Sequence, residues 1–224
     1  MREGIKVSEE QAVQIEVQTR AQATSTQWQK ERKVRLTASH FGEICKMTED
    51  RDIEKLCKSM HNPPNLIQKP AIRHGCTYED VALKKFSEMT GKKVLKSGLC
   101  VHPDYPFLGA SPDAFVEGEE AVCEVKCPYN GRKKKISPGK DFSFLEEVDG
   151  EIHLKKNHNY YYQVIGQLKL SKRSFCYFIV YTFEDIFVEK IAMDEEFFKS
   201  NMLLKLLDFY DIHYCPYLAE ILKK

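Results

Sequence analysis

Two carboxylates and a lysine lie near one another in the middle of this 224-residue chain. Asp113 closes a Ser-Pro-Asp run, and Glu124 and Lys126 follow in the apolar segment 121–126. If this segment is a β-strand, Val122, Glu124 and Lys126 leave one face, while Ala121, Cys123 and Val125 leave the other. A hairpin over 107–126 would bring Asp113 to the same end. The spacing therefore predicts two carboxylates and an ammonium group at one spot.

Such a site has a defined chemical use. Carboxylate oxygens suit Mg²⁺ or Mn²⁺. A bound ion can activate a water molecule and neutralise charge on a phosphodiester. A lysine two residues after the carboxylate could orient or deprotonate that water. The alternative is an ordinary hairpin with an exposed Glu-Lys ion pair. The Ser-Pro-Asp run and the apolar setting favour the metal site.

The same residues resemble the motif of the PD-(D/E)xK nuclease superfamily. Pro112 and Asp113 match its opening pair, and Glu124-Val125-Lys126 match its second half. The longer string GASPDAF…CEVKCPY is similar to the phage lambda exonuclease-like branch, the alkaline nuclease and viral recombinase type. Matching positions run from about residue 28 to residue 167. The resemblance implies an α/β fold with a restriction-endonuclease-like core, a central mixed β-sheet flanked by helices.

The resemblance also implies an activity, that of a Mg²⁺-dependent 5′→3′ exonuclease. Its substrate would be linear double-stranded DNA with 5′-phosphorylated ends, in recombination, repair or the processing of viral and mobile-element DNA. Two Mg²⁺ per active site, replaceable by Mn²⁺, would be held by Asp113, Glu124, the Val125 carbonyl and Glu79, directly or through water. Lys126 would orient or activate the attacking water. The implied partners are DNA ends, two further copies in a homotrimer, and a single-strand annealing protein.

Glu79 is singled out by its position in a predicted helix over 70–90. Apolar residues follow it three, four and seven positions later, so its carboxylate is in line with the buried stripe. A buried carboxylate is costly unless it is paired or bound to metal. A residue at the stripe's edge that reaches solvent is the alternative. The HGxxxE pattern at 74–79 resembles the family's upstream helix motif, which implies that Glu79 is an active-site residue.

The N-terminal part of the chain offers groups that suit a phosphate. A helix is expected over 8–31, and Trp28 and Arg32 lie one turn apart near its end. Ser39 starts a second expected helix, and helix N-termini attract anions. Simple helix capping is the alternative for this serine. The resemblance implies that Trp28 stacks on the duplex end and that four residues hold the terminal 5′-phosphate, namely Arg32, Ser39, Ser111 and Gln163.

The C-terminal half is predicted to border a DNA channel. A helix over 159–170 carries Tyr160, Gln163 and Gln167 on one stripe, where a phenol and amides suit phosphate contacts. Polar solvent-facing positions are the alternative. The basic loop region 127–158 precedes this helix. We expect the channel to be lined by Tyr160 and by the basic run Arg132, Lys133, Lys134 and Lys135, although a solvated loop is the alternative for that run.

Composition places the chain in the class of globular proteins. With 42% hydrophobic residues and a net charge of +1, we expect one nuclease domain over 1–224 that binds DNA through a local patch. Residues 1–25 are expected to form an N-terminal helix whose start is loosely ordered. Eight scattered cysteines without a C-x-x-C pair indicate free thiols and argue against a zinc site. No secretory or membrane-spanning segment is evident, so we expect an intracellular protein, without distinguishing nucleus from cytoplasm.

Two other functions fit the same residues. A structure-selective endonuclease or resolvase would use the same core, and it would cut covalently closed circular DNA. A DNA-binding module whose nuclease has decayed would fail to bind Mg²⁺ or Mn²⁺. The intact Asp113, Glu124 and Lys126 argue against decay.

Overall fold

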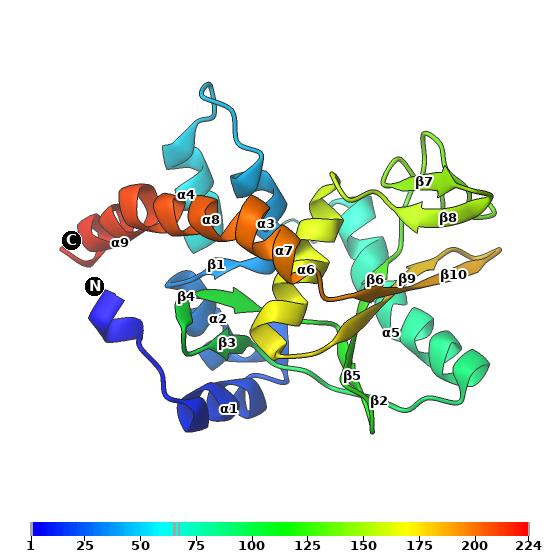
Figure 1. Cartoon of the computed structure of the whole chain (residues 1–224), viewed down its shortest axis with the longest axis horizontal. Coiled ribbons are helices and arrows are strands. Elements are labelled where there is room, and N and C mark those ends of the chain that lie inside the picture. The colour runs from blue at the N-terminus through cyan, green and yellow to red at the C-terminus, as the bar shows by residue number, and fades with distance from the viewer. Residues whose placement is uncertain (1, 65, 67, 224) are drawn as a thin grey trace.

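A computed structural model describes residues 2–64, 66 and 68–223. Its centre is a five-stranded sheet in the order β10-β9-β6-β5-β2 (Figure 1). β6 and β9 run parallel and the other neighbours are antiparallel, so the predicted central mixed sheet is confirmed. The strands are β2 (Val94–Leu95), β5 (Ala114–Val116), β6 (Ala121–Lys126), β9 (Phe175–Tyr181) and β10 (Ile186–Ala192).

A smaller sheet lies beside the first and has the order β1-β4-β3. Its strands are β1 (Leu36–Thr37), β3 (Cys100–His102) and β4 (Tyr105–Ala110). The hairpin expected over 107–126 is thus divided, because β4 belongs to this sheet while β5 and β6 pair in the large one. Ser111, Pro112 and Asp113 form the link between the two sheets.

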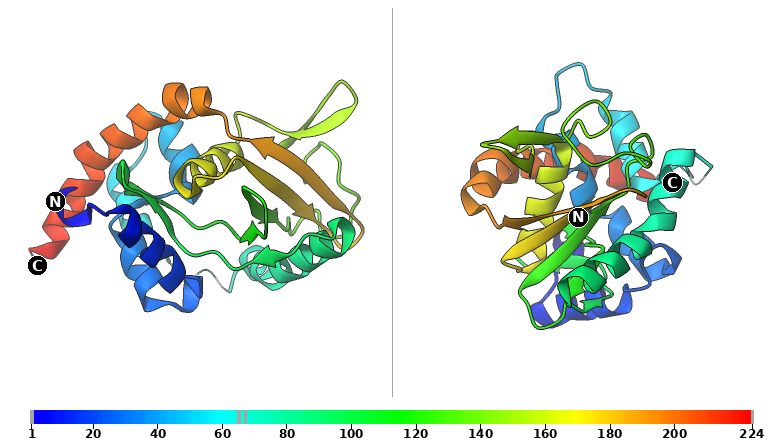
Figure 2. Two further views of the ribbon diagram at one scale, coloured as in Figure 1. Left: turned by 60° about the horizontal axis from the view of Figure 1, so that its bottom comes forward. Right: turned by 90° about the vertical axis from the view of Figure 1, so that its right-hand side faces the viewer.

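Helices cover both faces of the large sheet (Figure 2). On one face α5 (Pro70–Thr90) packs three side chains, Ala82, Leu83 and Phe86, against Ala121, Cys123 and Val125. On the other face α6 (Asn159–Ser171) and α3 (Ala38–Cys45) share a core with Val122 and Phe178. The alternation predicted for β6 is therefore confirmed, and it directs Glu124 and Lys126 towards α6.

The N-terminal segment differs from the single helix expected over 8–31. It forms η1 (Arg2–Ile5), α1 (Glu9–Gln18), η2 (Gln22–Thr24) and α2 (Thr26–Lys33). The Thr19 hydroxyl donates to the Ile15 carbonyl at 2.6 Å, a bond that competes with helix continuation. Gln22 then has a φ of 42°, which ends the helical path. Residues 97–99 separate β2 from β3 and are bonded to Glu16 and Thr19 at the end of α1.

The region 127–158 holds a hairpin that was not predicted, β7 (Leu145–Val148) and β8 (Glu151–Leu154). Its turn residues Asp149 and Gly150 have φ values of 53° and 84°. Asp-Gly between two strand-like segments is a signature of such a turn, so this signal was available in the sequence.

The remaining elements are helical. They are α4 (Ile53–His61), α7 (Glu195–Phe197), η3 (Phe198–Leu203), α8 (Leu204–Phe209), η4 (Tyr210–Tyr214) and α9 (Cys215–Leu222). Helical structure thus continues from Glu195 to Leu222. Throughout the described ranges, no helix has the length and apolar character needed to cross a membrane.

Candidate active site at the end of the central strand

Glu124 is the most enclosed charged group of the site, with 2% of its surface exposed. Its Oε1 accepts hydrogen bonds from Lys126 Nζ at 2.5 Å and from Gln163 Nε2 at 2.7 Å. Its Oε2 accepts from Gln167 Nε2 at 2.5 Å. These donors offset the cost of burying a carboxylate. Gln167 is 1% exposed, so the alternative of a solvent-facing stripe on α6 is wrong for this residue.

Lys126 is enclosed by the same elements. Its ammonium group also lies 3.2 Å from Gln163 Oε1 and 4.3 Å from the centre of the Tyr160 ring. Burial by itself lowers the pKa of Lys126, but the carboxylates of Glu124 and Asp113 outweigh burial and hold the pKa above its usual value. The side chain is therefore a fixed cation at neutral pH.

Asp113 forms two hydrogen bonds with the backbone of β6, one through its amide and one through its carboxylate. Its amide donates to the Cys123 carbonyl at 3.0 Å, and Val125 N donates to Asp113 Oδ2 at 2.6 Å. The N–H and C=O of one strand residue leave the same edge of the strand, so the Val125 carbonyl also lies on the Asp113 side. Burial, with the charges of Glu124 and Glu79, raises the pKa of Asp113 well above its usual value.

Glu79 completes the charged group from the α5 side. It is half-buried, and burial together with the nearby Glu124 and Asp80 carboxylates raises the pKa of Glu79 to about 6. Lys126 opposes this rise. The structure thus places all four sequence-predicted catalytic residues within electrostatic reach of one another.

The donor chemistry of these residues fits a divalent cation. Three carboxylates face one ammonium, which leaves two excess negative charges when all are ionised, and their repulsion contributes to the raised pKa values of Asp113 and Glu79. Carboxylate and carbonyl oxygens are the ligands that Mg²⁺ and Mn²⁺ prefer. In the described part of the chain, however, no three acidic, His or Cys side chains already stand close enough to enclose an ion. Glu124 is instead directed to Lys126 and the two glutamines.

A second group of predicted residues lies at Ser111, two residues before Asp113. Trp28 Nε1 donates to Ser111 Oγ at 2.9 Å, and the Arg32 guanidinium carbon lies 4.0 Å from the centre of the Trp28 ring. Burial lowers the pKa of Arg32 to about 10, so the group is still charged at neutral pH. Among the residues that the structure describes, no carboxylate forms an ion pair with it. Arg32 is thus an enclosed cation without a counter-charge.

Ser39 is exposed and lies in the first turn of α3, directly after β1. β1 runs parallel to β4 with Thr37 beside Gly109, so Ser39 and Ser111 each follow two residues after the paired positions. Thr37 precedes α3 without a side-chain cap, which leaves the first amides of that helix for another acceptor. Burial lowers the pKa of His40, and the positive charge of Arg32 lowers it further, which places Arg32 near the start of α3.

The predicted channel residues divide into two kinds. Arg132 stacks on Tyr129 at 3.9 Å, and Lys134 Nζ forms an ion pair with Asp141 at 2.5 Å. Lys133 and Lys135 are exposed, and within the described ranges neither has an ion-pair partner. Tyr160 faces Lys126 and so lies with the charged residues around Glu124. Gln163 likewise contacts Glu124, and no contact joins it to Arg32 in the described part of the chain.

Sequence reasoning missed the direct contact of Gln167 with the catalytic carboxylate. The available signal was its position one helical turn after Gln163 on the same stripe. It also missed Gln22 and Ser97, which bind the Pro112 carbonyl.

Comparison with known proteins gives a family match over most of the chain. The model of the YqaJ-like viral recombinase domain matches residues 27–174. The uncharacterized protein YqaJ of Bacillus subtilis strain 168 is 36% identical over 72 residues, which are 32% of this chain and 23% of that protein. The match therefore spans less than a quarter of that relative's length.

Solved structures with a similar fold include an alkaline exonuclease, LHK-Exo, from Laribacter hongkongensis, with a TM-score of 0.64 and 21% identity over 88% of this chain and 97% of that chain. A phage-related exonuclease from Haemophilus somnus 129PT has a TM-score of 0.59 and 12% identity over 84% and 96%. A SOX protein, solved in complex with DNA, has a TM-score of 0.58 and 12% identity over 93% and 72%. These likenesses confirm the predicted fold class.

Proposed function

Since the chain belongs to the family of YqaJ-like viral recombinase domains, in the phage lambda exonuclease-like branch of the PD-(D/E)xK superfamily, we propose that it is a metal-dependent DNA exonuclease. The observation that carries the proposal is the buried Glu124, bonded to Lys126 and close to Asp113 and Glu79. Two proteins of similar fold, the alkaline exonuclease LHK-Exo and the phage-related exonuclease, support it. The proposed reaction is 5′→3′ degradation of linear double-stranded DNA from 5′-phosphorylated ends.

Asp113, Glu124, the Val125 carbonyl and Glu79 would hold two Mg²⁺, directly or through water, and Mn²⁺ would substitute. When bound, such ions activate water and neutralise charge on the scissile phosphate. The excess of two negative charges among these residues supports this role. Ion binding would require Glu124 to give up part of its bonding to Gln163 and Gln167.

Lys126 would orient the attacking water and stabilise negative charge on the phosphate. Its raised pKa keeps the ammonium protonated at neutral pH, which suits a hydrogen-bond donor better than a proton acceptor. Glu124, Gln163 and the Tyr160 ring hold the ammonium in place, so little reorganisation is needed during the reaction.

Arg32, Ser39 and Ser111 would bind the terminal 5′-phosphate. The guanidinium has no counter-charge within the described residues, and α3 begins beside it without a side-chain cap. Trp28 would stack on the end of the duplex from its place between Arg32 and Ser111. Gln163 would contribute to this pocket through the side-chain amide that also bonds to Glu124.

Digestion of one plasmid in two forms tests the proposal. The linearised and the covalently closed plasmid are incubated with Mg²⁺ or with EDTA. We expect loss of the linear form only, and only with Mg²⁺. Cutting of the closed circle would favour the endonuclease alternative on the same core. If both forms survived, the decayed DNA-binding module would be favoured.

A further inference from the structure

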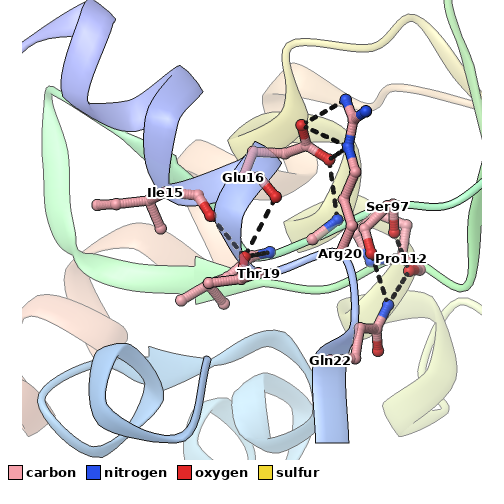
Figure 3. Close-up of polar contacts among 9 residues, drawn as sticks. Ile15, Glu16, Thr19, Arg20, Gln22, Ser97 and Pro112 are labelled. Atoms are coloured by element: carbon pink, nitrogen blue, oxygen red, sulfur yellow. Dashed lines mark hydrogen bonds and ion pairs between the residues drawn. The ribbon is translucent and has the colours of Figure 1, made fainter. Parts of the chain in front are cut away.

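A side chain from the N-terminal segment reaches the backbone beside Asp113 (Figure 3). Gln22 Nε2 donates to the carbonyls of Ser97 and Pro112, each at 3.0 Å. The Ser97 hydroxyl donates to the same Pro112 carbonyl. Pro112 has no amide hydrogen, so this buried carbonyl is its one backbone hydrogen-bonding group, and it receives two donors.

Gln22 holds an unfavourable backbone conformation to make this contact. Its φ of 42° lies in the left-handed region, which side chains other than glycine rarely adopt. The turn is fixed on both sides, because Gln22 N donates to the Thr19 carbonyl at 2.8 Å and Ser25 N donates to the Gln22 carbonyl at 2.8 Å. Strained residues of this kind persist where the surrounding structure holds them, and they are frequent at functional sites.

The other donor, Ser97, belongs to a segment that is hydrogen-bonded to the end of α1 (Figure 3). Gly98 N donates to Glu16 Oε1 at 2.9 Å, and Leu99 N donates to Thr19 Oγ1 at 2.7 Å. A side chain at Gly98 would overlap the Glu16 carbonyl, so the approach of the two segments requires glycine there. The end of α1 and residues 97–99 therefore form one unit that presents two donors to Pro112.

This unit constrains the link between the two sheets just before Asp113. The Asp113 amide and carboxylate are already tied to β6, through Cys123 and Val125. Fixing the Pro112 carbonyl removes the remaining freedom of the peptide that leads into Asp113. We propose that Gln22 is a positioning residue, which sets the Asp113 carboxylate for metal binding through the Pro112 carbonyl. The inference rests on the proposed function and adds a residue to its site.

Two substitutions separate positioning from folding. Gln22→Gly removes the amide and relieves the left-handed strain, so we expect it to fold. Gln22→Asn keeps an amide and tolerates the backbone but is one methylene too short to reach Pro112. Gln29→Ala is the matched control, because the Gln29 amide also donates to a backbone carbonyl, that of Ala23, at 3.0 Å. Mn²⁺ affinity is measured by calorimetry and folding by the thermal unfolding midpoint.

We expect Gln22→Gly and Gln22→Asn to bind Mn²⁺ roughly 10-fold to 100-fold more weakly, as found when outer groups that orient metal ligands are lost. Gln29→Ala should bind like the wild type, and the midpoint of Gln22→Gly should match that of the control. In cleavage assays of the two Gln22 variants, kcat should fall and the KM for DNA should be unchanged. A higher Mg²⁺ concentration should be needed for the half-maximal rate.

The outcomes distinguish this inference from the proposed function. Equal Mn²⁺ affinity of the wild type and Gln22→Gly would overturn the positioning role alone. Wild-type protein that binds Mn²⁺ but leaves linear DNA intact would overturn the exonuclease proposal alone. If Gln22→Gly failed to fold, Gln22→Asn would decide, because it keeps an amide and tolerates the backbone but cannot reach the Pro112 carbonyl, and an unchanged affinity of that variant would refute the positioning role.

Discussion

At the scale of single residues, Lys126 is a cation held by the site rather than a solvent-exposed side chain. Replacing it with alanine should lower the cleavage rate by roughly 10³-fold or more, because the donor that stabilises charge on the phosphate is lost. DNA binding should persist, since the phosphate-pocket residues remain. Single-turnover cleavage with Mg²⁺ and binding by fluorescence anisotropy in EDTA measure the two effects. Lys93→Ala, which breaks an exposed ion pair with Glu117, is the control, and unchanged turnover of Lys126→Ala would remove Lys126 from the mechanism.

The raised pKa of Glu79 predicts that the stability of the protein depends on pH. Its pKa in the folded protein is about 6, against an ordinary value of 4.5. Between these two values the folded state binds more protons than the unfolded state, so stability falls as pH rises through this window. In EDTA at pH 8, Glu79→Gln should therefore raise the free energy of unfolding by about 1–2 kcal/mol, discounted for the exposed part of the side chain.

Urea denaturation at pH 4 and pH 8 checks this prediction. The gain from Glu79→Gln should be present at pH 8 and much smaller at pH 4, where the carboxyl is mostly protonated in both states. Glu88→Gln is the control, because Glu88 lies on the same helix and forms an exposed pair with Lys84. Saturating Mn²⁺ should stabilise the wild type more than the variant. A gain of the same size at both pH values would mean that the charge of Glu79 is not its cause.

The charge of Arg32 leads to a prediction about which DNA ends are degraded. Its enclosed charge, which no carboxylate of the described residues pairs with, should favour 5′-phosphorylated over 5′-hydroxyl ends, and Arg32→Ala should abolish that preference. Arg32→Lys should restore it only in part, since lysine lacks the planar group that stacks on Trp28. Initial rates on two duplexes that differ only in the terminal phosphate provide the measurement. A preference that survives in Arg32→Ala would place the phosphate pocket elsewhere.

At the scale of elements, the features that depend on local periodicity could be predicted from the sequence. The alternation of β6 placed Glu124 and Lys126 on one face, and the apolar stripe of α5 marked Glu79 as anomalous. The division of the N-terminal helix had no such signal. It depends on bonds from Thr19 and Gln22 to residues about 80 to 90 positions away, and such contacts leave no periodic trace in one sequence.

The lysines of the basic run 132–135, in the loop before β7, differ in their contacts. Lys133 and Lys135 are exposed and, in the described part of the chain, lack ion-pair partners, whereas Lys134 pairs with Asp141. Replacing Lys133 and Lys135 together with alanine should weaken DNA binding and reduce the slope of log K against log salt by about 2, one unit per lost phosphate contact. Lys84→Ala/Lys85→Ala on α5 is the matched double variant. An unchanged slope would show that the loop lies outside the DNA path.

At the scale of the whole molecule, the net charge provides little attraction for DNA, whereas the fold brings together groups that suit a DNA end. The chain as a whole has a net charge of only +1, so a single copy has little long-range attraction for DNA. The proposed site nevertheless joins separate parts of the fold: α2 and α3 contribute to the phosphate pocket, β6 supplies Glu124 and Lys126, α5 supplies Glu79, and α6 supplies the glutamines. End binding would therefore depend on a few enclosed groups rather than on a basic surface.

This weak overall field leads to a prediction about processivity. A single copy should leave DNA within a few cycles at physiological salt, because few phosphates hold it. If the homotrimer that the family resemblance implies forms a ring around DNA, digestion should continue after an excess of competitor DNA is added. Light scattering should then give three times the mass of one chain. A single-chain mass with continued digestion in the presence of competitor would contradict the argument, because the enclosed groups of one copy would then be sufficient to retain the duplex.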